Sequence, residues 1–273
     1  MINNTFELID KFQPLPVQIA IDKCKLEEVI ETIFSQLFPV CEELNLGGIH
    51  EKLKDCAVAL NVNIAKLKGQ TFADEAVHTF FLRFEEIRSR LYEDAKCYLK
   101  NDPAAKSLDE VIVAYPGFFA LSVYRIAHQL HSLSVPLIPR LFSEYAHSKV
   151  GIDIHPAAKI GKNLFLDHGT GIVIGETSEI GNNVKIYQGV TLGALYVEKN
   201  LSDVKRHPTV EDNVVIYANA TILGGETVIG HNSVIGGGAW LTHSVIPYSL
   251  VYNSVDVKIR TVKNFHQPID FSI

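Results

Sequence analysis

Residues 151–193 read GIDIHPAAKIGKNLFLDHGTGIVIGETSEIGNNVKIYQGVTLG, and apolar side chains recur in this stretch at every sixth position. One run begins at Ile154. A second run, shifted by two residues, begins at Ile174 and continues in phase from Val210 to Trp240, with Ile246 just beyond. The steps are Ile154, Ile160, Leu166, Ile172, Ile174, Ile180, Ile186, Leu192, Val210, Ile216, Ile222, Val228, Val234 and Trp240. A period of six fits neither an α-helix nor a single strand, but it is typical of a solenoid with three flat faces per coil. We therefore predict a parallel β-helix over residues 149–257.

The composition limits the class of protein. The chain has 273 residues, enough for about two domains, and 47% of them are hydrophobic. A net charge of −6 without a basic stripe argues against a nucleic-acid partner. No signal-peptide pattern and no apolar stretch of about 20 residues is present, so we expect no membrane association. The four cysteines (Cys24, Cys41, Cys56 and Cys97) have no CxxC spacing and predict reduced thiols in a cytoplasmic protein.

The first half of the chain has a helical pattern. Apolar residues repeat at intervals of three and four from Leu26 to Val40 and from Leu82 to Tyr92. Pro103 breaks this pattern after Asp102, and a further helix is expected to begin near Pro116. We predict an α+β protein with a helical oligomerisation domain (1–148), a β-helix catalytic domain (149–257) packed against it, and an extended C-terminal tail (258–273).

Three interruptions of the six-residue period carry polar side chains. They are Asp153-Ile154-His155-Pro156, Asp167-His168-Gly169-Thr170-Gly171, and the stretch Gly193–Thr209, which is expected to loop out and contains Arg206-His207-Pro208. Asp153 and His168 lie slightly less than one coil apart, so strand spacing allows their side chains to meet. A carboxylate against one imidazole nitrogen favours a general base at the other nitrogen. His207 lies further along the solenoid, and it can reach the same substrate across an interface between neighbouring prisms. Taken alone, His155 is best interpreted as a hydrogen-bonded surface residue.

Several of these segments together resemble the serine O-acetyltransferases. They are GIDIHPAAKIG (151–161), LDHGTGIVIGET (166–177), GVTLG (189–193), RHP (206–208) and, upstream, NDPAA (101–105) and YPGFFALSVYRIAHQLH (115–131). The likeness is close over about residues 100–250 and is one of helical character only over residues 20–100. The resemblance implies a left-handed parallel β-helix of hexapeptide repeats behind a helical domain.

The resemblance also implies a reaction and a set of site residues. His168, held by Asp153, would deprotonate the serine hydroxyl, which attacks acetyl-CoA to give O-acetylserine for cysteine biosynthesis. Asp102 and Asp167 would bind the substrate ammonium, and Arg206 and His207 its carboxylate or hydroxyl, a charge arrangement that suits an amino acid. The CoA channel would be lined by Gly193, Ala194, Ala218 and Ala220. Acetyl-CoA would be a co-substrate, with no permanently bound cofactor, no metal and no covalent acyl-enzyme.

The same resemblance implies regulation and assembly. L-Cysteine would compete with serine as a feedback inhibitor. The C-terminal Ile273 would enter the active site of O-acetylserine sulfhydrylase. The chain would form homotrimers, and the helical domain would pair two trimers into a hexamer.

Two segments depart from the family pattern. The family's short TLGGTGK loop is here the longer TLGALYVEKNLSDVKRHP, and the usual GVPA segment is here NSVDVKI (253–259). Three alternatives remain open: an acetyltransferase of the same fold that acts on homoserine or a sugar, a γ-type carbonic anhydrase with zinc on His155, His168 and His207, and a scaffold that binds only the sulfhydrylase.

Overall fold

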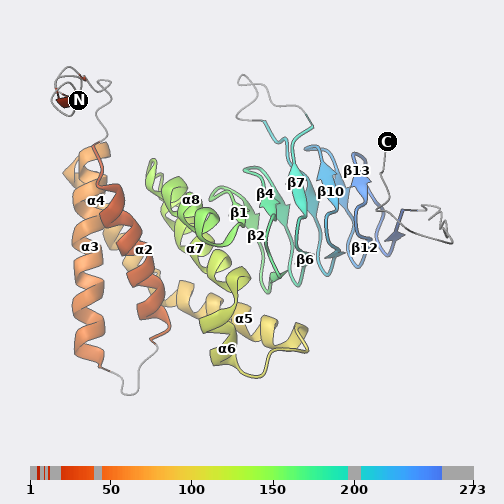
Figure 1. The fold of residues 1–273 in the computed structure, drawn as a ribbon, viewed down its shortest axis with the longest axis horizontal. Coiled ribbons are helices and arrows are strands. Elements are labelled where there is room, and N and C mark those ends of the chain that lie inside the picture. The colour runs from red at the N-terminus through yellow and green to blue at the C-terminus, as the bar shows by residue number, and fades with distance from the viewer. Residues whose placement is uncertain are drawn as a thin grey trace.

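The computed structural model describes residues 20–39, 45–195 and 204–253, together with Thr5, Phe6, Ile9 and Phe12. Helices precede a parallel β-solenoid in these ranges (Figure 1). The helices are α2 (Lys23–Leu37), α3 (Leu46–Lys68), α4 (Gln70–Leu82), α5 (Phe84–Asn101), α6 (Leu108–Ala114), α7 (Pro116–Ser132) and α8 (Ile138–Val150). The predicted tail (258–273), its Ile273, and Val40 and Cys41 lie outside the described residues.

The solenoid consists of three parallel sheets, to which successive strands contribute in turn. Sheet 1 holds β1 (Asp153–Ile154), β4 (Val173–Ile174), β7 (Thr191–Gly193), β10 (Thr221–Leu223) and β13 (Trp240–Leu241). Sheet 2 holds β2 (Lys159–Ile160), β5 (Glu179–Ile180), β8 (Thr209–Val210) and β11 (Val228–Ile229). Sheet 3 holds β3 (Phe165–Asp167), β6 (Lys185–Tyr187), β9 (Val215–Ile216), β12 (Val234–Ile235) and β14 (Leu250–Val251).

Three edges connect these sheets. The first edge joins sheet 1 to sheet 2, the second joins sheet 2 to sheet 3, and the third joins sheet 3 to sheet 1 of the next coil. Gly193 ends β7 and Thr209 begins β8, so the residues between them belong to the first edge (Figure 1).

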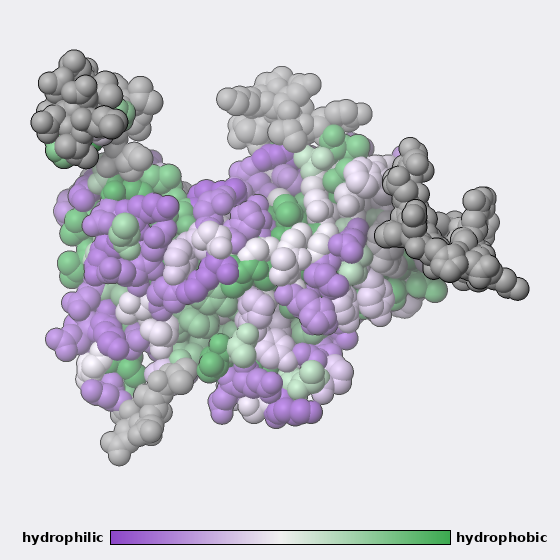
Figure 2. All heavy atoms as spheres, in the orientation of Figure 1, coloured by the Kyte–Doolittle hydropathy of each residue, from purple (hydrophilic) through white to green (hydrophobic). Residues whose placement is uncertain are grey.

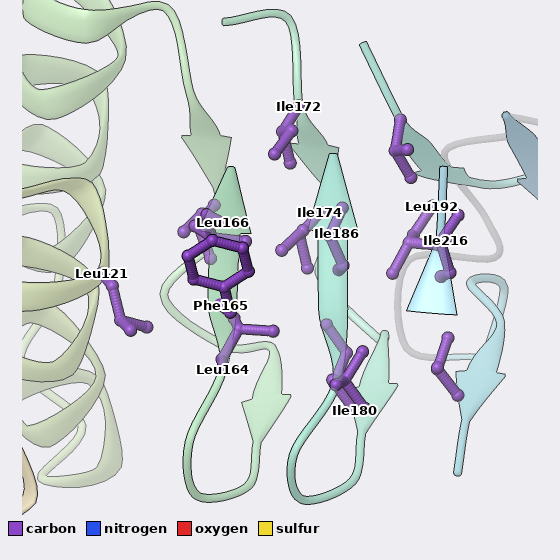
Figure 3. Close-up of a cluster of buried hydrophobic side chains, with 14 of the residues drawn as sticks. Leu121, Leu164, Phe165, Leu166, Ile172, Ile174, Ile180, Ile186, Leu192 and Ile216 are labelled. Carbon is purple, nitrogen blue, oxygen red and sulfur yellow. The ribbon is translucent and has the colours of Figure 1, made fainter. Parts of the chain in front are cut away.

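The six-residue period is confirmed as the origin of the solenoid core. Its inward side chains stack along the axis, with Ile154 paired to Ile174 and Leu166 to Ile186 between coils (Figure 3). The two-residue slip between the runs is absorbed at the third edge, in Asp167–Gly171. Most of the stacked aliphatic side chains are almost wholly withdrawn from water, and each such burial contributes about 1.5–3 kcal/mol.

The predicted phase is wrong after Ile222. The inward positions there are Ile229 and Ile235, not Val228 and Val234, while Trp240 is 68% and Ile246 77% exposed. The strand register gives the reason, because Val210 pairs with Ile229. The corner between β10 and β11 is therefore one residue longer than the period requires.

Asparagines with left-handed backbone form much of the second edge. Asn163, Asn183 and Asn213 have φ values of 58°, 57° and 60°. Asparagine tolerates this conformation better than most residues. Their side-chain amides also bond from coil to coil, from Asn163 to Asn183 at 2.9 Å and from Asn183 to Asn213 at 3.1 Å. This ladder holds consecutive coils in register.

The helical pattern is confirmed in part. The predicted apolar face of α2 is buried. Leu82 is 73% exposed because α4 ends there, and Tyr92 is 44% exposed because it lies beside the buried face of α5 and not on it. The Pro103 and Pro116 predictions are confirmed: α5 ends at Asn101, and Pro116 opens α7. Hydrophilic side chains cover much of this part of the molecule in the view of Figure 2. None of the described helices is by itself long and apolar enough to cross a bilayer, and α6 with α7 meets that test only as a pair bent by 75°.

The helical part and the first coil share one hydrophobic core. Leu121 of α7 points toward Phe165 and Leu166 of β3 (Figure 3). An ion pair between Asp94 of α5 and Arg125 of α7 lies beside this core at 2.7 Å, with the Asp94 side chain fully buried. Arg125 also donates to the carbonyl of Gly161, and Asp94 accepts from the Asn163 N–H. This packing fixes α5 relative to the first coil of the solenoid.

Candidate active site

The third edge carries Asp167 and His168, where β3 ends. His168 has a φ of 56°, in the left-handed region that favours glycine, and Gly169 and Gly171 follow with φ values of 84° and 81°. The chain turns outward here, so the His168 side chain is 73% exposed while that of Asp167 is 21% exposed. The His168 Nε2 lies 4.0 Å from the Asp167 Oδ1.

Asp102 reaches the same edge from the end of α5. Its Oδ1 accepts the Ala104 N–H at 2.8 Å, and its Oδ2 accepts the Tyr115 hydroxyl at 2.5 Å. The Tyr115 hydrogen bond, followed by the Ala104 N–H, lowers the pKa of Asp102, and the nearby His168 adds to this effect. The same bond raises the pKa of Tyr115 to about 12. The structure therefore brings Asp102, Asp167 and His168 together at the third edge, and the carboxylate of Asp102 is held in its ionised form.

Asp153 lies on β1, where its neighbour in the sheet is Val173. Among the described residues, no hydrogen bond or ion pair joins its carboxylate to His168, whose acidic neighbour is Asp167. The exposed imidazole would have to turn toward sheet 1 to meet Asp153.

Arg206 and His207 lie at the first edge and not at the third. Arg206 pairs with Glu176, and the backbone N–H groups of Arg206 and His207 donate to the Thr177 Oγ1 at 2.9 and 3.0 Å. Only 8% of His207 is exposed. Burial, with the charge of Arg206, lowers the pKa of His207 to about 4. Within one chain these two residues are therefore separated from His168 by the width of sheet 1.

His155 also belongs to the first edge. Its Nδ1 accepts the Ala157 N–H at 3.1 Å, in keeping with the expected hydrogen-bonded residue. The ring is half-buried, however, and burial lowers its pKa to about 4 despite the nearby Glu176. No group of three His, Cys, Asp or Glu side chains among the described residues is arranged to hold a metal ion.

The four predicted CoA-channel residues do not lie together in one chain. Gly193 and Ala194 lie at the first edge and Ala218 at the third. Ala220 is fully buried in the solenoid core, so that its side chain cannot line a channel.

Three features of these edges could not be predicted from the sequence. Tyr115 and Thr177 belong to longer motifs, and nothing in their spacing indicates contacts with Asp102 and His207. Tyr187 and Tyr217 stack at 4.9 Å on the third edge, beyond Asp167. Their spacing across the long loop hid this relationship.

A parallel β-solenoid built on a six-residue period places the chain in the class of hexapeptide-repeat proteins. No protein-family model matches the chain. The plasmid serine acetyltransferase of Synechococcus elongatus is 48% identical over 178 residues, which are 63% of this chain and 56% of the relative. The serine acetyltransferase of Helicobacter pylori is 52% identical over 122 residues, which are 45% of this chain and 69% of the relative. The chain belongs to the serine acetyltransferase family. It spans little more than half the length of several curated relatives, including 58% of one from Bacillus licheniformis.

Solved structures are similar over more of the chain. Serine acetyltransferase isoform 3 of Entamoeba histolytica, in complex with cysteine, has a TM-score of 0.79 and 32% identity and covers 96% of this chain and 93% of its own. The Neisseria gonorrhoeae enzyme in complex with serine has a TM-score of 0.62 and 28% identity, covering 89% and 98%. The Brucella abortus enzyme in complex with coenzyme A has a TM-score of 0.59 and 27% identity, covering 81% and 76%.

Proposed function

We propose that this chain transfers the acetyl group of acetyl-CoA to the hydroxyl of L-serine, giving O-acetylserine and CoA for cysteine biosynthesis. The observation that carries the proposal is the meeting of Asp102, Asp167 and His168 at one edge of the prism. Two carboxylates beside an exposed imidazole can bind an ammonium group and place a hydroxyl against a base. The family membership of the chain supports the same reaction.

In the proposed mechanism His168 removes the serine hydroxyl proton as the oxygen attacks the thioester carbonyl. The new C–O bond forms as the C–S bond breaks, and the proton on His168 goes to the departing CoA sulfur. Asp153 orients the imidazole and stabilises its protonated form once the ring turns toward sheet 1. General-base catalysis of this kind contributes about 10²–10⁴-fold to the rate.

The proposed substrate site is shared between chains. Asp102 and Asp167 bind the serine ammonium, while Arg206 and His207 of a neighbouring copy bind its carboxylate or hydroxyl. A homotrimer with three equal interfaces would place the third edge of one prism against the first edge of the next. Gly193, Ala194 and Ala218 would then line one acetyl-CoA channel, with only the backbone of Ala220 facing it. The helical domain (1–148) would pair trimers into a hexamer.

Further partners follow from the same site and from the family. L-Cysteine would occupy the serine site as an inhibitor, as the cysteine complex of the Entamoeba histolytica relative suggests. Ile273, outside the described residues, would bind O-acetylserine sulfhydrylase. The described cysteines Cys24, Cys56 and Cys97 are free thiols, which supports a cytoplasmic location.

The test measures CoA release from acetyl-CoA with L-serine, with L-homoserine and without an acceptor, for the wild type and His168→Ala. Serine-dependent release that His168→Ala reduces at least about 10²-fold would support the proposal. Release with homoserine alone would favour a homoserine acetyltransferase. Release that His168→Ala leaves unchanged would refute the assigned base.

A further inference from the structure

Three consecutive residues of the first edge, Gly175, Glu176 and Thr177, contact both Arg206 and His207 across the long loop. Glu176 forms an ion pair with Arg206. The Thr177 Oγ1 accepts the two backbone N–H groups of Arg206 and His207. A Cβ atom at position 175 would overlap the His207 ring, so only glycine leaves room for the imidazole. Each residue of the segment therefore has a separate contact with this pair.

The hydrogen bonds at the His207 ring determine its tautomer. The Thr177 backbone N–H, which can only donate, points at Nδ1 at 3.1 Å. The Thr177 Oγ1 lies 2.9 Å from the same nitrogen. Because this oxygen already accepts two backbone N–H groups, its own proton is directed to Nδ1. Nδ1 is thus an acceptor of two hydrogen bonds, and the ring proton must be on Nε2.

The surroundings of His207 also keep the ring neutral. Protonation of Nδ1 would break both hydrogen bonds and place a second positive charge beside Arg206 in a buried position. The charged groups around the ring are Arg206, Lys205 and Glu176, of which Glu176 is paired with Arg206. A neutral imidazole with its proton on Nε2 donates a hydrogen bond and does not act as a base there.

We propose that Gly175, Glu176 and Thr177 form a positioning cradle that holds Arg206 and His207, and that Thr177 fixes His207 as a neutral Nε2–H donor to a substrate oxygen. This inference rests on the proposed function for the identity of that oxygen, the carboxylate or hydroxyl of serine. It divides the two site histidines into one base, His168, and one hydrogen-bond donor, His207.

The Gly-Glu-Thr sequence of residues 175–177 recurs at residues 225–227, and the second copy provides a control. Gly225-Glu226-Thr227 lies at the same edge, after β10, and the Thr227 hydroxyl donates to the Leu223 carbonyl at 2.7 Å. Among the described residues, this hydroxyl makes no hydrogen bond to Arg206 or His207. Thr227→Val therefore removes a similar hydroxyl without touching the cradle.

The experiment compares the wild-type full chain with Thr177→Val, Thr177→Ser and Thr227→Val. The first measurement is the ¹⁵N spectrum of the histidine rings, with the His207 signals assigned by their loss in His207→Asn. We expect an Nε2–H tautomer in the wild type, Thr177→Ser and Thr227→Val. In Thr177→Val the backbone N–H still faces Nδ1, so Nε2–H should stay the main tautomer. Loss of the hydroxyl bond should allow a minor Nδ1–H fraction and a titration of His207 at higher pH.

The second measurement is steady-state kinetics with L-serine. Thr177→Val should raise the serine KM about 10-fold, while Thr177→Ser should restore it to near the wild-type value. A proton on Nδ1 in the wild type, or a Thr177→Val variant with unchanged spectrum and unchanged serine KM, would overturn the inference. If the wild type transfers no acetyl group to serine but shows the expected spectra, the proposed function fails and the cradle stands.

Discussion

The Tyr115 hydroxyl donates a 2.5 Å hydrogen bond to Asp102, and this bond joins the start of α7 to the end of α5 at the third edge. Tyr115 is the residue before Pro116, in an extended conformation that proline favours in its predecessor. Its ring meets that of the fully buried Tyr98 edge to face, at 6.1 Å between centroids. Tyr115 is therefore placed by packing on one side and holds one oxygen of Asp102 on the other.

We predict that Tyr115→Phe weakens binding of the substrate ammonium. Without the phenol the Asp102 carboxylate loses one of its two fixed partners, so the serine KM should rise about 5–10-fold while the acetyl-CoA KM stays unchanged. The ratio of kcat/KM for serine to that for 3-hydroxypropanoate, which lacks the amine, should fall. Tyr145→Phe is the matched control, because Tyr145 donates a 2.5 Å hydrogen bond to Glu31 in the helical part. An equal fall in kcat/KM for serine and for 3-hydroxypropanoate in Tyr115→Phe would contradict this role.

The fold could be predicted largely from local pattern. The spacing of Ile154, Leu166 and Ile174 predicts the coils, because each of these side chains points into the core of the solenoid. The prediction failed at Val228 because one additional residue in a corner shifts every later inward position. An additional residue in a corner can be recognised in the sequence only from the shifted positions of the apolar residues in the strands that follow it.

The site could be predicted only as a set of residue types. Asp167 and His168 interrupt a repeat and are therefore visible in the sequence. Asp102 joins them because α5 is anchored to the solenoid, in part by Asp94 and Arg125, through long-range contacts that spacing does not encode. For the same reason, the placement of His207 on Thr177 depends on where the long loop returns to the prism.

We predict that Asp94→Asn destabilises the protein strongly. The substitution leaves the Arg125 guanidinium, whose side chain is only 9% exposed, without its countercharge, and breaking a buried pair in this way costs about 3–5 kcal/mol. Urea-induced unfolding followed by circular dichroism measures the change. Lys96→Ala is the control, since it removes an exposed ion pair with Glu93 and should cost less than about 1 kcal/mol. A similarly small decrease in the free energy of unfolding for both variants would show that the buried pair does not anchor the helices.

We predict that stability falls as the pH decreases from about 6.5 to about 4. The pKa values of His155 and His207 are lowered to about 4 in the folded chain, while a histidine in an unfolded chain titrates near 6.5. In this window the unfolded state binds more protons, so acid shifts the equilibrium toward unfolding. The measurement is the melting temperature as a function of pH. The fall of melting temperature with pH should be smaller in the double variant His155→Asn/His207→Asn than in the wild type. It should be unchanged in the control His78→Asn, at an exposed site. An equal fall in the wild type and both variants would be evidence against a contribution from His155 and His207.

We predict that two inactive variants restore activity when their subunits are mixed. His168 lies at the third edge and His207 at the first edge of each prism, so a site that uses both must take them from different copies. A trimer assembled at random from equal amounts of His168→Ala and His207→Ala chains has both histidines intact at about one interface in four, because each of the two neighbours is of the required type half of the time. Co-refolding the two variants should therefore recover about a quarter of the wild-type serine-dependent CoA release, whereas each variant refolded alone should stay inactive. Normal oligomers with no recovery would mean that one chain supplies both histidines to each site.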